Sequence, residues 1–327
     1  MTARGNPGLS VNLMPVGEPA QIAEMAALAE NLGYRRIWVA DEGIAGRDVY
    51  ISLAAVAQAT HTAAIGPGIT NPFLRHPAIT ASAIATLDEL SNGRAFCGLG
   101  AGGGLSLGPL AVPRHKPVRS VAEMIDAMRA LWADEIVNHE GVTLNLRHAR
   151  LANPPAKNTK ARNIEIHLAA RGPQMVKLAS QKADGFYISY IHKDFLGNLI
   201  TQLRSHKNLH LSYSTRIVTN DDDWHAARRD MTFRIPDSPP EVHDAINITP
   251  TQIDAIRTAL SQGGPDAATP LMKDDWVAPF VIAGTPDECR TELAQIVATH
   301  KIDDFVLNVA ELNTAPDQLH KTSQIIP

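Results

Sequence analysis

The chain has 327 residues, 44% of them hydrophobic but only 5% aromatic, so its core must be built mainly from Ala, Val, Ile and Leu. Its 30 basic and 34 acidic residues leave a formal charge of −4, with no basic block to neutralise a row of phosphates, which argues against nucleic acid as the main partner. No apolar run reaches the roughly 20 residues that a membrane-spanning helix needs. Residues 1–7 lack the apolar stretch of a signal peptide, and Cys97 and Cys289 form no Cys-x-x-Cys motif, so we expect a cytoplasmic protein.

In the first half of the chain, short apolar runs alternate with helical patterns. Strands are predicted at 9–14, 36–40, 64–69 and 94–99, and helices at 20–32, 49–60, from Pro77 onward and at 118–132. Gly33 stands where a helix end favours a left-handed residue. Pro77 is the proline favoured in the first turn of a helix.

The same alternation returns in the second half. Strands are predicted at 164–168, 185–189, 209–218 and 303–309, and helices at 173–182, 193–204, 223–231 and from Thr285–Pro286. Three insertions interrupt the alternation, near 102–117, at 138–146, where a small hairpin is expected, and at 232–279. Eight strand–helix units predict a (β/α)8 TIM barrel forming a single domain over residues 1–327. The alternative is an open doubly wound sheet, which usually has fewer strands.

The active site of such a barrel lies at the C-terminal ends of its strands. There the chain carries Asn12, the carboxylate pair Asp41 and Glu42, residues 68–71 and residues 100–102. Two adjacent carboxylates can raise one another's pKa and so suit proton transfer, or a hydrogen bond to a bound heterocycle. A solvated turn is the alternative interpretation of the pair.

Glycine-containing turns supply the other candidates. The turn Ala169, Ala170, Arg171, Gly172, Pro173 and Gln174 leads into a helix whose first N–H groups could hold a phosphate, or it is an ordinary turn. Gly98–Gly103 satisfies G-x-G-x-x-G, but prolines follow where a dinucleotide fingerprint needs a helix, so we expect backbone brought close to a ligand. His206 and His210 are interpreted as surface residues and 221–223 as a helix cap, and no metal site is predicted.

The segment from Ile65 to Arg94, IGPGITNPFLRHPAITASAIATLDELSNGR, resembles the coenzyme F420-dependent branch of the bacterial luciferase-like family, most of all the methylenetetrahydromethanopterin reductases. Supporting matches are WVAD at 38–41, GLGAG at 98–102, GPQM at 172–175 and GTPDE at 284–288. The likeness is strong from 9 to 195, patchy to 220 and nearly absent from 232 to 279.

The resemblance implies a barrel that binds reduced deazaflavin at its mouth, and a homodimer. It implies a non-proline cis peptide bond between Gly68 and Ile69 behind the deazaflavin ring. Residues 169–174 would correspond to the phosphate-binding turn, and Thr70, Asn71 and Ala101 to contacts with the ring and the cofactor's side chain. Because F420 is an anion and the protein is acidic, Arg171 and Lys177 would have to attract it locally.

The resemblance also implies the chemistry, which is transfer of a hydride between F420 and a C=N or C=C carbon of a medium-sized, pterin-like substrate. Asp41 would contact or protonate the ring. Glu42 stands where the family commonly has His, and Asn12 where the reductases have Glu, so a different substrate is expected, shaped by 232–279. Two alternatives remain open: an FMN-dependent luciferase-like monooxygenase, or a barrel that binds a flavin or F420 without turnover.

Overall fold

The fold is known from a computed structural model that describes residues 7–155 and 162–326. The N-terminal residues 1–6, part of the segment examined for a signal peptide, therefore lie outside the described residues. Eight parallel strands form one sheet, in the spatial order β3-β2-β1-β12-β9-β8-β7-β4. Their bounds are β1 (Gly8–Leu13), β2 (Tyr34–Val39), β3 (Ala64–Pro67), β4 (Phe96–Leu99), β7 (Glu165–Ala169), β8 (Gly185–Ser189), β9 (His210–Ser214) and β12 (Asp304–Val309).

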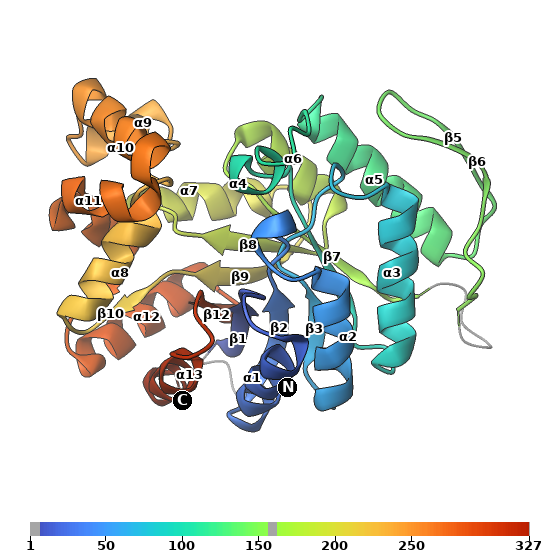
Figure 1. The fold of residues 1–327 in the computed structure, drawn as a ribbon, viewed down its shortest axis with the longest axis horizontal. Coiled ribbons are helices and arrows are strands. Elements are labelled where there is room, and N and C mark those ends of the chain that lie inside the picture. Colours follow the sequence, from blue (N-terminus) through green and yellow to red (C-terminus); the bar gives the residue numbers. More distant parts are fainter. Residues whose placement is uncertain (1–6, 156–161, 327) are drawn as a thin grey trace.

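The two edge strands of this sheet, β3 and β4, meet and close it into a barrel. Figure 1 shows the strands at the centre of the molecule with helices around them. The amide N–H of Ile65 donates to the carbonyl of Arg94 at 2.9 Å, that of Thr70 to Gly98 at 3.0 Å, and that of Gly100 to Thr70 at 2.9 Å. The predicted (β/α)8 barrel is therefore confirmed. The open doubly wound alternative is wrong, because the edge strands satisfy each other's backbone groups.

Helices surround the barrel. They are α1 (Pro19–Asn31), α2 (Val49–Ala59), α3 (Pro77–Leu90), α5 (Pro117–Trp132), α6 (Pro173–Lys182), α7 (Lys193–Leu203), α12 (Pro286–His300) and α13 (Ala315–Ile325). Local sequence explains most of their starts: Pro77 opens α3, the Asp48 carboxylate caps α2, and Thr285 with Glu288 forms a capping box on α12. Helix α13 was not predicted, and it packs beside α1 and α12.

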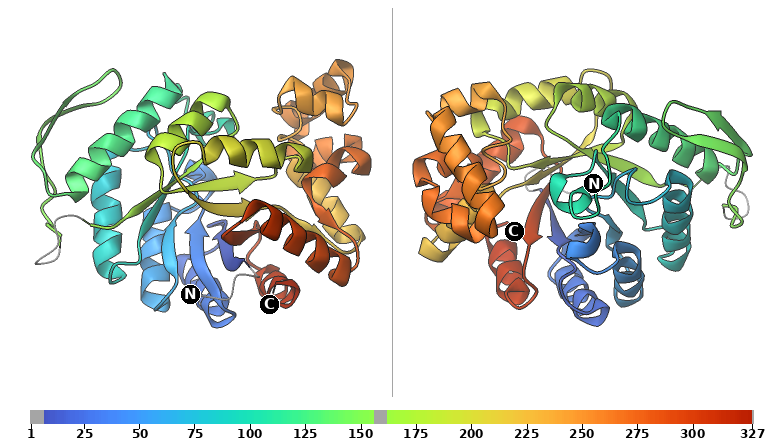
Figure 2. Two further views of the ribbon diagram at one scale, coloured as in Figure 1. Left: turned by 180° about the vertical axis from the view of Figure 1, so that it is seen from behind. Right: turned by 45° about the horizontal axis from the view of Figure 1, so that its top comes forward.

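The insertion at 232–279 is helical and has a hydrophobic core of its own. It comprises α9 (Pro240–Ala245), α10 (Pro250–Ala268), which is kinked at Gly263–Gly264, and α11 (Asp274–Val277), packed on α8 (Asp221–Met231). These helices stand on one side of the barrel, opposite the hairpin β5–β6 (Val137–Glu140 and Asn145–Ala149) (Figure 2).

One predicted strand was wrong in extent. Residues 209–218 do not form a single strand but divide into β9 and the short β10 (Ile217–Val218), which leaves the barrel to pair with β11 (Ile282–Ala283). The division has a consequence for the site. Because the chain turns outward after β9, strands β9 and β12 separate beyond Ser214 and Val306.

The barrel interior is filled in layers, whereas the outward strand faces are aliphatic. The layer at the N-terminal end is charged, and consists of Arg36, Glu165, His167, His210 and Asp304. An aromatic layer of Trp38, Phe96 and Tyr187 with Val306 lies above it. Burial and the Arg36 charge lower the pKa of His167 to about 4. The interpretation of His210 as a surface residue was wrong, because its imidazole pairs with Asp304 at 2.8 Å inside this layer.

Candidate active site

Asp41 and Thr70 form the central contact of the barrel mouth. Asp41 follows β2, and Thr70 follows β3 in the segment that also bonds to β4. The Thr70 hydroxyl donates to Asp41 Oδ2 at 2.7 Å and lies 3.5 Å from the hydroxyl of Tyr50 on α2. Burial raises the pKa of Asp41, and the hydrogen bond from Thr70 opposes that rise. The carboxyl group is thus poised to hold a proton at a higher pH than an exposed aspartate.

Glu42 is half-buried beside Asp41. Burial, and then the negative charge of Asp41, raise its pKa, whereas the positive charge of Arg234 lowers it. Arg234 comes from the insertion, immediately after α8. The acidic pair predicted at the strand end is therefore present, and it lies within reach of a basic group far away in the sequence.

Asn12 closes the floor of the mouth below the bond between Gly68 and Ile69. That bond is cis, as the resemblance implies. The Asn12 amide donates from Nδ2 to the Gly68 carbonyl at 2.8 Å, and its buried Oδ1 has no hydrogen-bond partner among the described residues. A side chain on Gly68 would meet Trp38, with its Cβ only 2.6 Å from the Cβ of Trp38. Glycine is therefore required by packing at this point.

Three residues that were not predicted from the sequence continue this polar floor. The Tyr187 hydroxyl of β8 donates to Asn308 Oδ1 of β12 at 2.8 Å, and Asn308 Nδ2 donates to the Ser214 hydroxyl at 2.8 Å. All three side chains point inward because they occupy alternate positions of their strands. Period-2 alternation along the predicted strands could have identified them as inward-facing.

The glycine-rich segment after β4 follows the seam with β3. A Cβ on Gly98 would lie 2.2 Å from the Pro67 carbonyl oxygen, and one on Gly100 would lie 2.4 Å from Ile69 Cδ1. The next helix, α4 (Gly104–Leu107), has one turn, which rules out the dinucleotide fingerprint. Ala101 is half-buried at the mouth. These glycines bring two backbones together at the seam.

Asn71 and Arg75, in the loop after β3, bond mainly to the protein itself. Asn71 Oδ1 accepts the N–H groups of Phe73 and Leu74, at 3.0 and 3.1 Å, and holds the loop. Arg75 pairs with Asp48 at 2.6 Å. Asn71 therefore stabilises the loop, and Asp48 neutralises the charge of Arg75.

The turn from Ala169 to Gln174 connects β7 to α6. Ala169 and Ala170 are half-buried, whereas Arg171 to Gln174 are exposed. Gly172 is the N-cap of α6, and no side chain of the described residues caps this helix end. Arg171 keeps an exposed surface, yet the surrounding protein desolvates it and, with the nearby Arg234 charge, lowers the pKa of Arg171 to about 10. The turn therefore presents a helix N-terminus and a guanidinium to a ligand.

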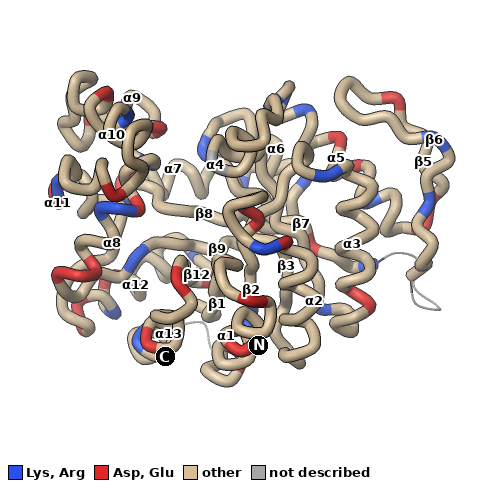
Figure 3. Tube along the Cα trace, in the orientation of Figure 1, with Lys and Arg blue, Asp and Glu red and all other residues tan. Residues whose placement is uncertain are grey.

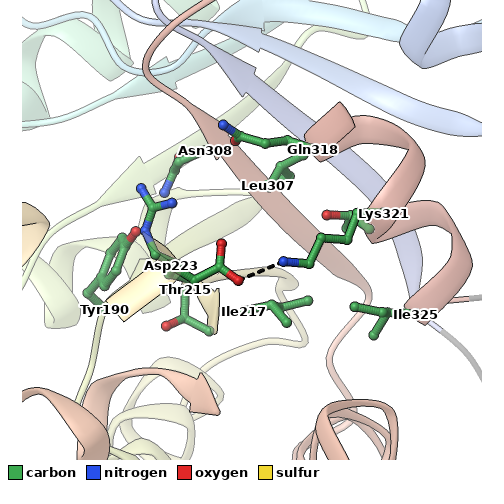
Figure 4. Close-up of a pocket in the computed structure, with 11 residues that line it drawn as sticks. Tyr190, Thr215, Ile217, Asp223, Leu307, Asn308, Gln318, Lys321 and Ile325 are labelled. Atoms are coloured by element: carbon green, nitrogen blue, oxygen red, sulfur yellow. Dashed lines mark hydrogen bonds and ion pairs between the residues drawn. The ribbon is translucent and has the colours of Figure 1, made fainter. Parts of the chain in front are cut away.

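A separate pocket lies where β9 and β12 separate (Figure 4). Tyr190 and Asn308 are among the residues that line it. Lys321 of α13 reaches across it to Asp223 at 2.6 Å, so its outer charges are paired. Acidic and basic residues are interspersed over the trace (Figure 3). The described residues contain no cluster of three or more His, Cys, Asp or Glu that could hold a metal ion. No helix in the described ranges could span a membrane.

Comparisons with known proteins agree with the fold described above. The family described as luciferase-like monooxygenase matches residues 4–300. The 5,10-methylenetetrahydromethanopterin reductase of Archaeoglobus fulgidus is 32% identical over 276 residues, covering 80% of this chain and 81% of the relative. The reductase of the same name from Methanolobus tindarius is 29% identical over 299 residues, covering 88% and 90%. The solved coenzyme F420-dependent tetrahydromethanopterin reductase of Methanopyrus kandleri has the same fold, with a TM-score of 0.86 at 23% identity and 98% coverage of each chain.

Proposed function

The chain belongs to the luciferase-like monooxygenase family, and we propose that within it this protein is an F420-dependent oxidoreductase. The reaction is hydride transfer between reduced deazaflavin and a C=N or C=C carbon of a medium-sized, pterin-like substrate. The observation that carries this proposal is the arrangement of the mouth, where an uncapped helix N-terminus with Arg171 lies at the edge of a site containing the protonatable Asp41. The reductases named above supply the cofactor and the reaction type.

The residues at the mouth fit such a cofactor. The turn 169–174 would hold an anionic tail through backbone N–H groups and the Arg171 guanidinium. Gly68, Ile69, Thr70 and Ala101 would line the ring, with Asn71 holding the loop beside it. When bound, F420 supplies a hydride from a ring carbon and does not activate oxygen readily.

Asp41 and Glu42 would donate or accept protons during this reaction. Both carboxyl groups have raised pKa values because they are buried, so each can retain a proton closer to neutral pH. Thr70 holds Asp41 in one orientation through its hydrogen bond. Asn12 cannot donate an acidic proton; its amide is held by the Gly68 carbonyl and acts as a positioning group.

Cofactor titrations test the proposal. Purified protein is titrated separately with F420 and FMN while cofactor fluorescence is recorded, and hydride transfer is then measured against a panel of imines, pterins and enones. Quenching of F420 at micromolar protein, with F420 turnover on at least one panel member, supports the proposal. Binding of FMN alone would indicate the monooxygenase alternative, and F420 binding without turnover of any panel member would indicate a non-catalytic barrel.

We also propose a homodimer, formed through the outer face of α2 and α3. Ile51 on α2 and Ile79 on α3 are 63% and 56% exposed, and these neighbouring helices pack against each other. Exposed isoleucines on adjacent helices favour burial against a second copy.

A cytoplasmic location is supported by Cys97 and Cys289, which are buried and unpaired. The hydrophobic core of the helical insertion also includes Tyr190 and Val218, which lie outside the insertion in the sequence. This shared packing supports a single domain.

A further inference from the structure

Arg234 is a basic residue at the mouth that the mechanism above does not use. It follows α8, and its guanidinium lies over the ring of Tyr190 at 4.2 Å and over that of Phe233 at 4.6 Å from the ring centroids. Its Nη1 donates to the Asp230 carbonyl at the end of α8. Its positive charge lowers the pKa of Glu42, which follows β2 at the barrel mouth.

The aromatic platform under Arg234 is held rigidly. Tyr190 follows β8 with a positive φ of 48°, and its hydroxyl donates to Asp230 Oδ2 at 2.8 Å. The same carboxylate oxygen accepts from Nη2 and Nε of Arg216, at 2.7 and 2.9 Å. Asp230 is therefore neutralised by Arg216. No ion pair joins this carboxylate to Arg234 among the described residues, which leaves the charge of Arg234 available.

Arg171 brings a second guanidinium to the same place. Its Nη1 donates to the Arg234 backbone carbonyl at 3.3 Å, and the positive charge of Arg234 helps to lower the pKa of Arg171. Within the described residues, neither guanidinium forms an ion pair with a carboxylate, although the charge of Asp237 favours the protonated form of Arg171. The two positive charges repel each other, and an anion between them removes the repulsion.

We propose that Arg234 and Arg171 form an anion clamp, which binds a carboxylate or phosphate group of a molecule held at the mouth. The clamp joins a βα turn of the barrel to the insertion, so a bound anion would bridge these two parts of the chain. The proposal rests on the proposed function for the identity of the ligands. The anionic group belongs either to the tail of F420 or to the substrate, and both present the same oxygen chemistry to the fork of an arginine.

Substitution of Arg234 tests the clamp. Arg234→Gln keeps a donor for the Asp230 carbonyl but removes the charge, and Arg234→Lys keeps the charge without the planar fork. The matched control is Arg229→Gln, because Arg229 lies on α8, close to Arg234 in the chain, and pairs with Asp266 on the outside. Each variant is titrated with F420 and with the deazariboflavin that lacks the anionic tail, and its melting temperature is measured with and without inorganic phosphate.

We expect Arg234→Gln to lose anion affinity about ten- to a hundred-fold, Arg234→Lys to lose less, and Arg229→Gln to match wild type. Weaker F420 binding with unchanged binding of the tail-less deazaflavin assigns the clamp to the cofactor. Unchanged F420 binding, with phosphate raising the melting temperature of wild type but not of Arg234→Gln, assigns it to the substrate. If Arg234→Gln behaves like Arg229→Gln in both measurements, the clamp proposal is wrong. If wild type does not bind F420, the proposed function fails while the phosphate measurement still decides the clamp.

Discussion

The hairpin β5–β6 depends on a single buried carboxylate. Glu123 of α5 is 3% exposed and accepts the N–H groups of Val142, Thr143 and Leu144 at 2.8 to 2.9 Å, with the Thr143 hydroxyl and the Arg119 guanidinium. Burial alone would raise the pKa of Glu123, but these donors lower it from 4.5 to about 2. Replacement by Gln should therefore release the hairpin tip from the helix.

The size of the effect follows from proton linkage. A folded-state pKa near 2 against an ordinary value of 4.5 corresponds to about 3 kcal/mol at 1.36 kcal/mol per pH unit. Because the folded-state pKa is the lower one, this stabilisation is complete above about pH 4.5 and is lost as the pH falls toward 2. Glu123→Gln should thus cost about 2–3 kcal/mol at pH 7 and much less near pH 3.

Limited proteolysis and thermal unfolding measure this cost. At pH 7, a protease should cut Glu123→Gln within residues 137–149 well before wild type, because the hairpin opens locally. The control is Glu140→Gln on the hairpin itself, where the side chain is exposed. Since proteases differ in activity at acid pH, melting temperatures at pH 7 and near pH 3 provide the pH comparison. Equal cutting of the two variants, or a stability difference that does not narrow in acid, would refute the reasoning.

Three further outcomes follow from the mouth and the core. Thr70→Val removes the hydrogen bond that opposes the raised pKa of Asp41, so the limb of the pH–rate profile set by Asp41 should move to higher pH. An unchanged limb would mean that Asp41 takes no part in the reaction. Gly98→Ala should lower stability by about 3 kcal/mol or more in urea unfolding, because its Cβ meets the Pro67 carbonyl, whereas Gly103→Ala, with open space, should stay within about 0.5 kcal/mol. Burial raises the pKa of the Cys97 thiol to about 12, so neither Cys97 nor Cys289 should react with a thiol reagent until the protein unfolds; fast native labelling would contradict their burial.

Much of the fold could be predicted because the signals are local. Alternating apolar runs, the first-turn proline at Pro77 and the Thr285 capping box each depend on neighbouring residues, so the eight strands and most helices followed from pattern. The cis bond at Gly68–Ile69 followed from resemblance instead. The division of residues 209–218 was missed, because a continuous apolar run does not show which neighbour each part will pair with.

The candidate site was likewise predictable from the sequence only in part. By itself, the sequence determined that Asn12, Asp41 and the turn at 169–174 would lie at strand ends, since chain order and barrel topology place them there. Only the tertiary structure decided which groups meet. Arg234 reaches Arg171 and acts on Glu42, Tyr187 bonds to Asn308, and Glu123 holds the hairpin. These partners are 20 to more than 100 residues apart, and no local pattern encodes contacts that form only when the barrel closes and the insertion folds back beside its mouth.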